Sequence, residues 1–291
     1  MNAIIMAAGM SSRFVPLCWE RPKALLEVKG EILIERQIRQ LKEAGIQDIT
    51  IVTGYKAEMF GYLKDKFGVK LVNNPDYERY NNTSTLMCVL NVLGDTWICS
   101  SDNYFTENVF LERPEQSQYS AEYAQGKTNE YCLYTDDKDN IIKVTVGGAD
   151  SWYMIGHVFF SRKFSEVFQK VLPEEYQNEV VRKGYWEDVY VKHLRELPPM
   201  KIRKFQSGII QEFDTLEELR VFDNSYLDDT RSQVLAWICQ QMDCRQKDIR
   251  NIKKRAKECY KYSFEFEVYG NIYVYFSDRL PKGQIRRIKN K

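Results

Sequence analysis

The sequence of 291 residues lacks several features that would define common classes of protein. Its formal net charge is only +1, so no strong field of one sign indicates nucleic acid as a partner. No apolar run approaches the roughly 20 residues that a membrane span requires. The N-terminus has neither the basic start nor the small-residue cleavage site of a signal peptide. We therefore expect a cytoplasmic protein with no membrane span and no nucleic-acid partner.

The cysteines and histidines also show no pattern that indicates a metal site, a disulfide framework or a catalytic histidine. The seven cysteines are scattered and none forms a C-x-x-C pair, so neither a zinc site nor a disulfide framework is indicated. The two histidines are His157 and His193, and neither lies near another candidate site residue. His157 falls in the apolar run 155–160, which favours a core histidine over a catalytic one.

The first 25 residues contain the strongest local pattern. A short apolar run at 3–6 opens into the small-residue loop 7–14, and R-P-K-A-L follows at 21–25. The loop is neither a P-loop nor a G-x-G-x-x-G dinucleotide loop. A strand that opens into such a turn presents backbone N–H groups to a phosphate, and Arg13 and Lys23 add cations that suit a triphosphate. The alternative is a tight connection beside two surface cations.

Strands and helices alternate over the next part of the chain. Apolar spacing predicts helices over 31–44 and 57–67, and β-rich runs predict strands over 48–53 and 69–72. This alternation is typical of parallel βαβ units, so we expect a Rossmann-like, mostly parallel α/β sheet flanked by helices. Ligands in such sheets bind outside the carboxyl ends of the strands, where the opening loop lies.

The polar segment 81–84 allows two interpretations. Thr83 or Ser84 is a candidate N-cap for an apolar helix over 86–93. In the alternative, the amides of Asn81 and Asn82 lie near the base of a nucleotide or near its substrate. The residues alone leave both interpretations open.

Between 119 and 160 the pattern changes. Four short strands are expected at 120–123, 130–135, 141–146 and 153–160, with Asp-, Asn- and Gly-rich turns between them. They predict a small antiparallel or mixed extension over the acceptor side of a cleft. Helices over 165–171, 185–197 and 216–222 and a strand over 201–205 complete this part of the chain.

A shift in composition after residue 229 predicts a second part of the chain. A short helix is expected over 232–242, and the alternating run 260–277 predicts a β-hairpin. We therefore expect a main domain over 1–225 and a small α+β appendage over 226–291.

Two carboxylates follow predicted strands and are candidate metal ligands. Asp102 comes directly after a strand over 97–101, and Asp214 follows Glu212 in the sequence E-F-D. Mg²⁺ prefers one or two carboxylates together with phosphate oxygens and water, which fits this inventory. A turn or helix-capping role for each aspartate is the alternative.

Residues 1 to about 222 resemble the bacterial CTP:phosphocholine cytidylyltransferase family through motifs that occur in the same order. The motifs are A-A-G-x-x-S-R-F, R-P-K-A-L, V-x-G-Y at 52–55, Y-N-N-x-x-S/T-L at 80–86, S-D-N-Y at 101–104, T-N-E-aromatic at 128–131, Y-W-E-D at 185–188 and E-F-D at 212–214. The first two are shared with sugar-phosphate nucleotidyltransferases and indicate the superfamily only. The later ones are more specific.

The resemblance implies roles for individual residues. It implies that Arg13 and Lys23 are the catalytic cations on the triphosphate and that Asp102 and Asp214 bind Mg²⁺ as the cofactor. The implied nucleotide-binding residues are Ala7, Ala8, Gly9, Ser11, Ser12, Arg13, Lys23, Tyr55, Asn81, Asn82, Thr83, Ser84 and Asp102.

The implied acceptor site is aromatic and acidic. A quaternary ammonium cannot donate hydrogen bonds, so aromatic faces and a nearby carboxylate hold it best. The expected acceptor residues are Asn103, Tyr104, Tyr131, Tyr185, Trp186, Glu187, Asp188 and Glu212. Tyr131 stands where the family pattern leads us to expect a tryptophan. Core packing of the Tyr-Trp pair is the alternative.

The resemblance therefore implies an Mg²⁺-dependent enzyme that transfers CMP from CTP to phosphocholine, giving CDP-choline and pyrophosphate. Alternatives are another acceptor, such as phosphoethanolamine, 2-aminoethylphosphonate or a sugar 1-phosphate, and a non-catalytic nucleotide-binding module. Residues 232–275 separately resemble the opening of a choline kinase-like phosphotransferase lobe. The chain ends before any H-x-D or D-F-G-like motif, so we expect a remnant without kinase chemistry.

Overall fold

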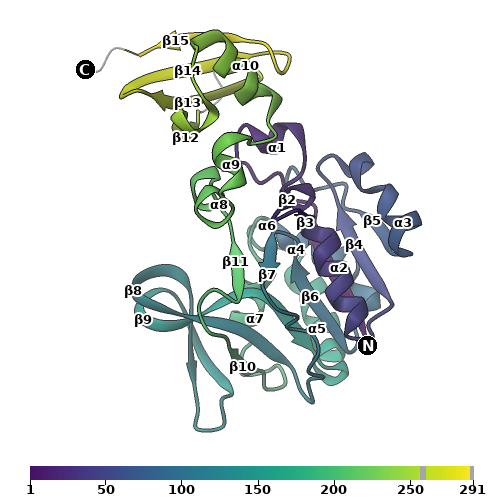
Figure 1. Ribbon diagram of the computed structural model, residues 1–291. Helices are drawn as coiled ribbons and strands as arrows, with labels where there is room; N and C mark the ends of the chain where they lie inside the picture. The colour runs from purple at the N-terminus through teal and green to yellow at the C-terminus, as the bar shows by residue number, and fades with distance from the viewer. Residues whose placement is uncertain (256–259, 289–291) are drawn as a thin grey trace. The chain divides into compact units, whose positions relative to one another are not determined.

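The computed structural model describes residues 1–255 and 260–288 (Figure 1). The chain divides into two compact units, the first formed by Met1–Gly9 with Leu33–Glu212 and the second by Met10–Ile32 with Phe213–Lys291. The segment 10–32, which carries Arg13 and Lys23, thus groups with the C-terminal residues. The boundary expected at residue 225 divides the chain by function, whereas the two units are defined by compactness. The functional boundary stays a prediction.

The first unit is built on a seven-stranded sheet of order β10-β8-β9-β6-β1-β4-β5 (Figure 1). β1 pairs in parallel with β4 and β6, β4 with β5, and β10 with β8, whereas β9 is antiparallel to β6 and β8. The predicted mostly parallel, Rossmann-like sheet is therefore confirmed. Its strands are β1 (Asn2–Ala7), β4 (Ile49–Thr53), β5 (Lys70–Asn73), β6 (Thr96–Ser100), β8 (Gln118–Thr135), β9 (Ile141–Phe160) and β10 (Lys201–Lys204).

Helices cover both faces of this sheet because the direction of its crossovers reverses after β5. Right-handed crossovers place α2 and α3 on one face and α4 on the other. α5 and α7 pack with α4 over a core that contains Ile4 and Val52. The helices and turns of this unit are α2 (Leu33–Glu43), η2 (Ala57–Phe60), α3 (Tyr62–Phe67), α4 (Asn82–Met87), η3 (Leu90–Val92), α5 (Arg162–Glu175), α6 (Glu179–Lys183) and α7 (Trp186–Lys192).

The expectation of four short strands between 119 and 160 is wrong. β8 and β9 are two long antiparallel strands, joined at the predicted turn 136–140. The glycines at 147 and 148 lie inside β9, in a region where the strand register shifts, and do not reverse the chain. A Cβ at Gly148 would lie 2.9 Å from the Cys132 sulfur, so this glycine permits close passage of the two strands.

Several predicted helices are shorter than expected. Glu31–Ile32 forms β3, which pairs with β2 (Glu27–Val28), and the helix begins only at Leu33. The helix expected over 57–67 is interrupted at Gly61. The helix expected over 86–93 is replaced by α4 and η3. Two short strands that pair with each other, β7 (Asn103–Phe105) and β11 (Ile210–Glu212), were not predicted.

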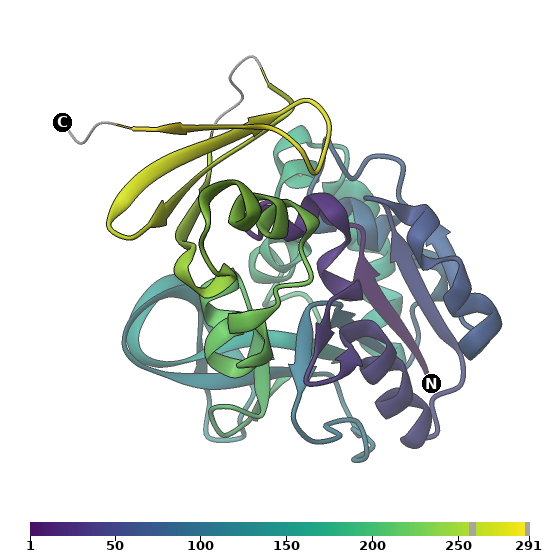
Figure 2. The same cartoon turned by 45° about the horizontal axis from the view of Figure 1, so that its top comes forward.

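The second unit joins the segment 10–32 to a small α/β structure. The predicted hairpin is confirmed, with Tyr269 and Gly270 at positive φ in its turn. The helix α10 lies beside the four-stranded sheet of this unit (Figure 2). Trp237 of α10 packs against that sheet, with its ring centroid 6.0 Å from that of Tyr275. The elements are α1 (Leu17–Glu20), η1 (Lys23–Leu25), β2, β3, α8 (Leu216–Phe222), α9 (Ser225–Asp228), α10 (Gln233–Met242), η4 (Gln246–Asp248), β12 (Arg250–Lys254), β13 (Tyr262–Val268), β14 (Asn271–Ser277) and β15 (Gln284–Arg287).

Two further expectations concern the whole chain. The six cysteines among the described residues are free thiols, and Cys259 lies outside those residues. Over residues 1–255 and 260–288, none of the helices combines the length and apolar character that a membrane crossing requires.

Candidate active site

Three predicted site segments of the first unit meet at the carboxyl ends of neighbouring strands. β1 and β6 are in register with Met6 opposite Ser100, so Ala8 and Asp102 follow at the same level of the sheet. On the other side of β1, the Tyr55 N–H donates to the Ala8 carbonyl over 3.0 Å. A Cβ at Gly54 would lie 2.9 Å from that carbonyl oxygen, so the approach of the two loops needs a glycine. Residues 7–9 of the opening loop, the V-x-G-Y motif and Asp102 are thus brought together.

The cations of the opening segment belong to the second unit and converge on one carboxylate. Nη1 of Arg13 lies 2.7 Å from Oδ2 of Asp214, and Nζ of Lys23 lies 4.0 Å from Oδ1 of the same residue. Arg13 is largely exposed, whereas Lys23 is buried in the first turn of η1 with its ammonium 5.8 Å from the centre of the Phe14 ring. A buried ammonium requires a nearby anion. The two predicted triphosphate ligands therefore form an ion cluster with a predicted metal ligand.

The chemistry of the two aspartates suits Mg²⁺. Carboxylate oxygens are hard ligands, and Mg²⁺ completes its octahedron with phosphate oxygens and water rather than with a cage of side chains. Within residues 1–255 and 260–288, no group of three or more His, Cys, Asp or Glu side chains gathers into such a cage. Asp102 lies in the first unit and Asp214 in the second. Their joint binding of one ion therefore stays a prediction.

The segment 81–84 is held by internal hydrogen bonds. Asn81 is the N-cap of α4, and its side-chain oxygen accepts from the Asn82 N–H over 2.8 Å. The expectation that Thr83 or Ser84 caps this helix is therefore wrong. Both hydroxyls are buried, with Thr83 donating to the Gly184 carbonyl and Ser84 to the Asn81 carbonyl. Contacts of these two hydroxyls with a nucleotide would require this arrangement to open.

The Asn82 amide connects this segment to the Y-W-E-D motif. Its oxygen accepts from the backbone N–H of Trp186 over 2.9 Å, and its nitrogen donates to Oε2 of Glu187 over 3.1 Å. Glu187 also accepts from the Tyr119 hydroxyl over 3.1 Å. Burial raises the pKa of Glu187 to about 7, against the lowering effect of these hydrogen bonds. Tyr119 was missed by sequence reasoning because its partner Glu187 lies 68 residues away along the chain.

Tyr131, Tyr185 and Asp188 form an aromatic and acidic cluster at the surface. The Tyr131 hydroxyl donates to Oδ1 of Asp188 over 2.7 Å, and the Tyr185 N–H donates to Oδ2 over 3.0 Å. The two tyrosine rings stand at 83°, with their centroids 6.5 Å apart. Burial and the Asp188 carboxylate both raise the pKa of Tyr131, so its hydroxyl stays protonated. Two perpendicular rings beside a carboxylate are the components of a cation-binding corner.

Trp186 does not belong to this surface cluster, which corrects the sequence-based expectation. It is 1% exposed, stacks on Tyr119 at 6.0 Å between centroids, and meets Phe160 and Phe168 edge to face. A large aromatic side chain at the start of α7 packs inward because that helix covers the sheet. Within the described residues, its indole N–H has no hydrogen-bond partner.

The other predicted acceptor residues lie on β7 and β11. Glu212 is exposed and stands opposite Asn103 in the antiparallel pair. Asn103 is 1% exposed, and a Cβ at Gly156 would lie 3.1 Å from its side-chain oxygen. Tyr104 is 9% exposed, with the Arg36 guanidinium 4.5 Å from its ring centre. Asn103 and Tyr104 are thus interior residues, and only Glu212 of the three faces solvent.

Both histidines lie outside the candidate site. His157 is buried and shares a 3.0 Å hydrogen bond with Ser120, and burial lowers its pKa to about 3. It is therefore a neutral core residue, as predicted. His193 lies at the end of α7, where Glu175 and Glu196 raise its pKa.

Comparisons with known proteins agree with this arrangement. The MobA-like NTP transferase domain matches residues 3–110. The 2-aminoethylphosphonate cytidylyltransferase of Lancefieldella rimae is 34% identical over 230 residues, which cover 78% of this chain and 93% of that protein. The choline-phosphate cytidylyltransferase of Streptococcus pneumoniae is 33% identical over 220 residues, which cover 76% of this chain and 96% of that protein.

A solved cytidylyltransferase structure is also similar to this chain. The CTP:phosphocholine cytidylyltransferase of Streptococcus pneumoniae superimposes with a TM-score of 0.74 and 32% identity, covering 77% of this chain and 98% of that one. The mostly parallel sheet, the signature loop and the carboxylate at the strand end define a nucleotidyltransferase. More narrowly, the chain belongs to the group of bacterial cytidylyltransferases that includes the 2-aminoethylphosphonate and the choline-phosphate enzymes.

Proposed function

We propose that this enzyme transfers CMP from CTP to phosphocholine and releases pyrophosphate. A phosphate oxygen of the acceptor attacks the α-phosphorus of CTP, and the bond from that phosphorus to the bridging oxygen of the β-phosphate breaks. The products are CDP-choline and pyrophosphate, so atoms and charge balance without a redox step. The acceptor phosphate is already an anion near neutral pH, so a general base is unnecessary. Alignment and charge neutralisation supply most of the rate enhancement.

Arg13 and Lys23 are proposed to neutralise the triphosphate. The guanidinium of Arg13 is well suited to bidentate phosphate binding, and the Lys23 ammonium is a compact charge held in a buried position. Both cations now face Asp214. An incoming triphosphate would replace the Asp214 carboxylate as the anionic partner of both cations.

Mg²⁺ is the proposed cofactor, held by Asp102 and Asp214. When bound, it would neutralise the triphosphate and stabilise charge that develops on the leaving pyrophosphate. Asp214 would leave its ion pair with Arg13 to take part. The exposure of its side chain, 37%, is compatible with that exchange.

The observation that carries the choice of acceptor is the corner of Tyr131 and Tyr185 around Asp188. Both Asp188 oxygens already accept hydrogen bonds, from the Tyr131 hydroxyl and the Tyr185 N–H. What the corner offers a ligand is therefore two ring faces with a net negative charge beside them. This suits a quaternary ammonium, which attracts aromatic faces and donates no hydrogen bond.

2-Aminoethylphosphonate is the second candidate acceptor. The relative from Lancefieldella rimae, 34% identical to this chain, carries that substrate in its name. A primary ammonium has three N–H donors and gains most from nearby carboxylates. The exposed Glu212 is the residue that would favour it.

The test is pyrophosphate release from CTP and Mg²⁺ with a panel of acceptors at equal concentration. The panel contains phosphocholine, phosphoethanolamine, 2-aminoethylphosphonate and glucose 1-phosphate. We expect the highest kcat/KM with phosphocholine. A higher value with 2-aminoethylphosphonate would replace the proposed acceptor, and no release with any of them by a folded, CTP-binding protein would reject the proposed reaction.

A further inference from the structure

The segment that carries Arg13 and Lys23 is bound along its whole length by C-terminal residues. Residues 10–32 and 213–291 form one compact unit. The relatives described above are matched almost completely, yet they cover only 76–78% of this chain. About a fifth of this chain therefore lies outside the match to those relatives. The contacts within the second unit indicate what such additional residues do here.

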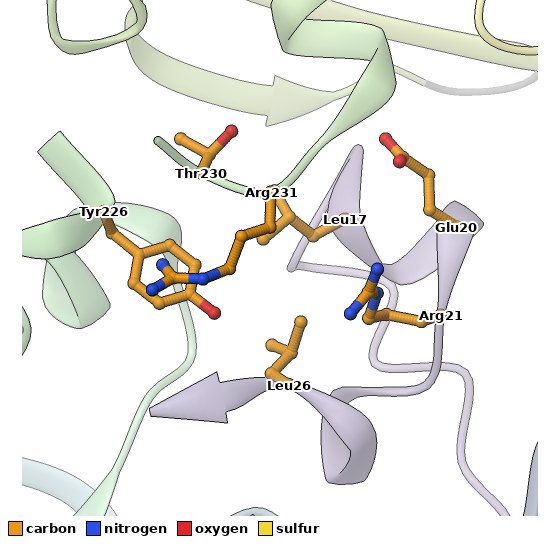
Figure 3. A pocket seen from close by; sticks show the side chains of 7 residues that line it. All are labelled: Leu17, Glu20, Arg21, Leu26, Tyr226, Thr230 and Arg231. Carbon is orange, nitrogen blue, oxygen red and sulfur yellow. The ribbon is translucent and has the colours of Figure 1, made fainter. Parts of the chain in front are cut away.

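Glu20 is the first point of attachment. It ends α1, three residues before Lys23, and its carboxylate sits at the start of α10 (Figure 3). Oε1 accepts from the Ser232 hydroxyl over 2.5 Å and from the Val234 N–H over 3.2 Å, and Oε2 accepts from the Gln233 N–H over 2.8 Å. These N–H groups have no partner inside the helix, and the helix dipole favours a negative charge at this end. One side chain thus holds two segments more than 200 residues apart.

Trp19 adds an apolar contact beside Glu20. Its ring centroid lies 5.1 Å from that of Tyr262 and 5.7 Å from that of Phe264, both on β13. α1 therefore contacts both the start of α10 and the four-stranded sheet. Because α1 is a single turn, its orientation depends on these contacts more than on its own hydrogen bonds.

The far end of the segment is attached as well. The Tyr226 hydroxyl donates to the Glu27 carbonyl over 2.7 Å, and the Lys29 N–H donates to Asp223 over 2.7 Å. Arg231 lies over the Tyr226 ring at 4.3 Å and 3.5 Å from the Glu27 carboxylate. A small pocket lies between these contacts, as Figure 3 shows, lined by Leu17, Glu20, Arg21, Leu26, Tyr226, Thr230 and Arg231.

From this arrangement we propose that residues 213–291 brace the phosphate-binding segment, with Glu20 as the positioning residue that transmits the brace to Arg13 and Lys23. The proposal rests on the proposed binding of CTP by these two cations. Arg13 precedes α1 and Lys23 follows it, so the orientation of this one turn sets the direction of both. Release of Glu20 from α10 would let the segment move, and CTP would then have to order it on binding.

The test compares two variants of the full chain that each remove one carboxylate charge from the second unit. Glu20→Gln removes the negative charge that accepts hydrogen bonds from Ser232, Gln233 and Val234 at the start of α10. Glu265→Gln, on β13 and near Arg255, is the matched control. CTP binding is measured by calorimetry without acceptor, and KM is then measured for CTP and for the acceptor separately. We expect Glu20→Gln to weaken CTP binding about 3- to 30-fold and to leave the acceptor KM within about twofold. The control should match the wild type.

Equal effects of Glu20→Gln on CTP and acceptor, or no effect on CTP, would overturn the brace. If Glu20→Gln does not fold, Ser232→Ala removes the hydrogen bond to Glu20 together with the N-cap bond from the Leu235 N–H, and it should weaken CTP binding about two- to fivefold. Hydrogen exchange of residues 10–32 supplies a readout that does not depend on CTP. Faster exchange there in Glu20→Gln than in Glu265→Gln is expected, and equal rates would contradict the brace even if the proposed reaction proved wrong.

Discussion

Nη1 of Arg13 lies 2.7 Å from Oδ2 of Asp214, so a cation of the opening loop and a carboxylate 201 positions further along the chain form one ion pair. Lys23 approaches the other oxygen of the same carboxylate at 4.0 Å. The two positive charges thus share one anionic partner. Under the proposed function, an incoming triphosphate would displace that carboxylate from both cations.

Substitution of either predicted metal ligand should abolish most activity. We expect Asp102→Ala and Asp214→Ala each to lower kcat at least about 100-fold, because each removes a charge that would hold Mg²⁺ at the reacting phosphates. Pyrophosphate release at saturating CTP checks this. Asp228→Ala, which removes an exposed carboxylate of the same unit as Asp214, is the control and should keep full activity. Near wild-type turnover in either site variant would show that its aspartate is not a metal ligand.

The tyrosine corner should determine affinity for the acceptor. Tyr185→Ala removes one exposed ring face, and we expect it to raise the KM for phosphocholine about 5- to 30-fold with little change for CTP. Tyr131→Phe keeps the ring and removes only the hydroxyl that donates to Asp188, so its effect should be smaller. Steady-state kinetics with both substrates checks the prediction. A proportional rise in the KM for CTP would count against an acceptor role.

Trp186 should affect stability and not acceptor binding. Trp186→Phe leaves part of a fully buried volume unfilled, so we expect the free energy of unfolding to fall by about 1–3 kcal/mol. The KM values for both substrates should stay within about twofold of the wild type. Urea unfolding and kinetics on the same preparation measure both. A large, selective rise in the acceptor KM would instead return Trp186 to the acceptor site.

Glu187 should make stability depend on pH. Burial raises its pKa in the folded protein to about 7, above the ordinary value of 4.5 that applies to the unfolded chain. The folded state therefore binds this proton more tightly. Its contribution to the free energy of unfolding is complete below about pH 4.5, falls as pH rises to about 7, and is then lost. The fall amounts to at most about 3 kcal/mol.

Glu187→Gln cannot titrate and should lack this part of the pH dependence. Urea unfolding of both proteins at about pH 5 and about pH 8 gives the comparison. We expect the wild type to lose more stability than the variant between these two values. The same loss in both proteins would show that Glu187 is not the group responsible.

The elements that the sequence predicted correctly are those whose form is decided by residues close to one another along the chain. The helix at 216–222 and the alternating hairpin are examples, since capping and periodicity decide them. Sequence reasoning failed at Gly147 and Gly148, which were interpreted as a turn. Gly148 lets β9 pass close to Cys132 on β8, and this packing contact across the strand pair leaves no local turn or periodicity signal.

In the candidate site too, the positions of the strand ends could be predicted from the sequence, whereas side-chain directions and contacts between distant residues could not. The strand ends of β1, β4 and β6 were predicted to meet at one edge, because parallel strands align their carboxyl ends. The inward direction of Trp186 was not predictable from Y-W-E-D, since either face of α7 can carry an aromatic residue. The capping of α10 by Glu20 was also missed, because no spacing rule connects residues 212 positions apart.

Phosphorus NMR of a competition reaction can observe directly whether CMP is transferred to phosphocholine. The enzyme is given CTP, Mg²⁺ and equal amounts of phosphocholine and 2-aminoethylphosphonate. Transfer to the first gives two phosphate signals of a diphosphate diester, and transfer to the second gives one phosphate and one phosphonate signal. We predict that the diphosphate of CDP-choline accumulates first and in excess. Predominant formation of the phosphonate anhydride, or no new signal with either acceptor, would contradict the account.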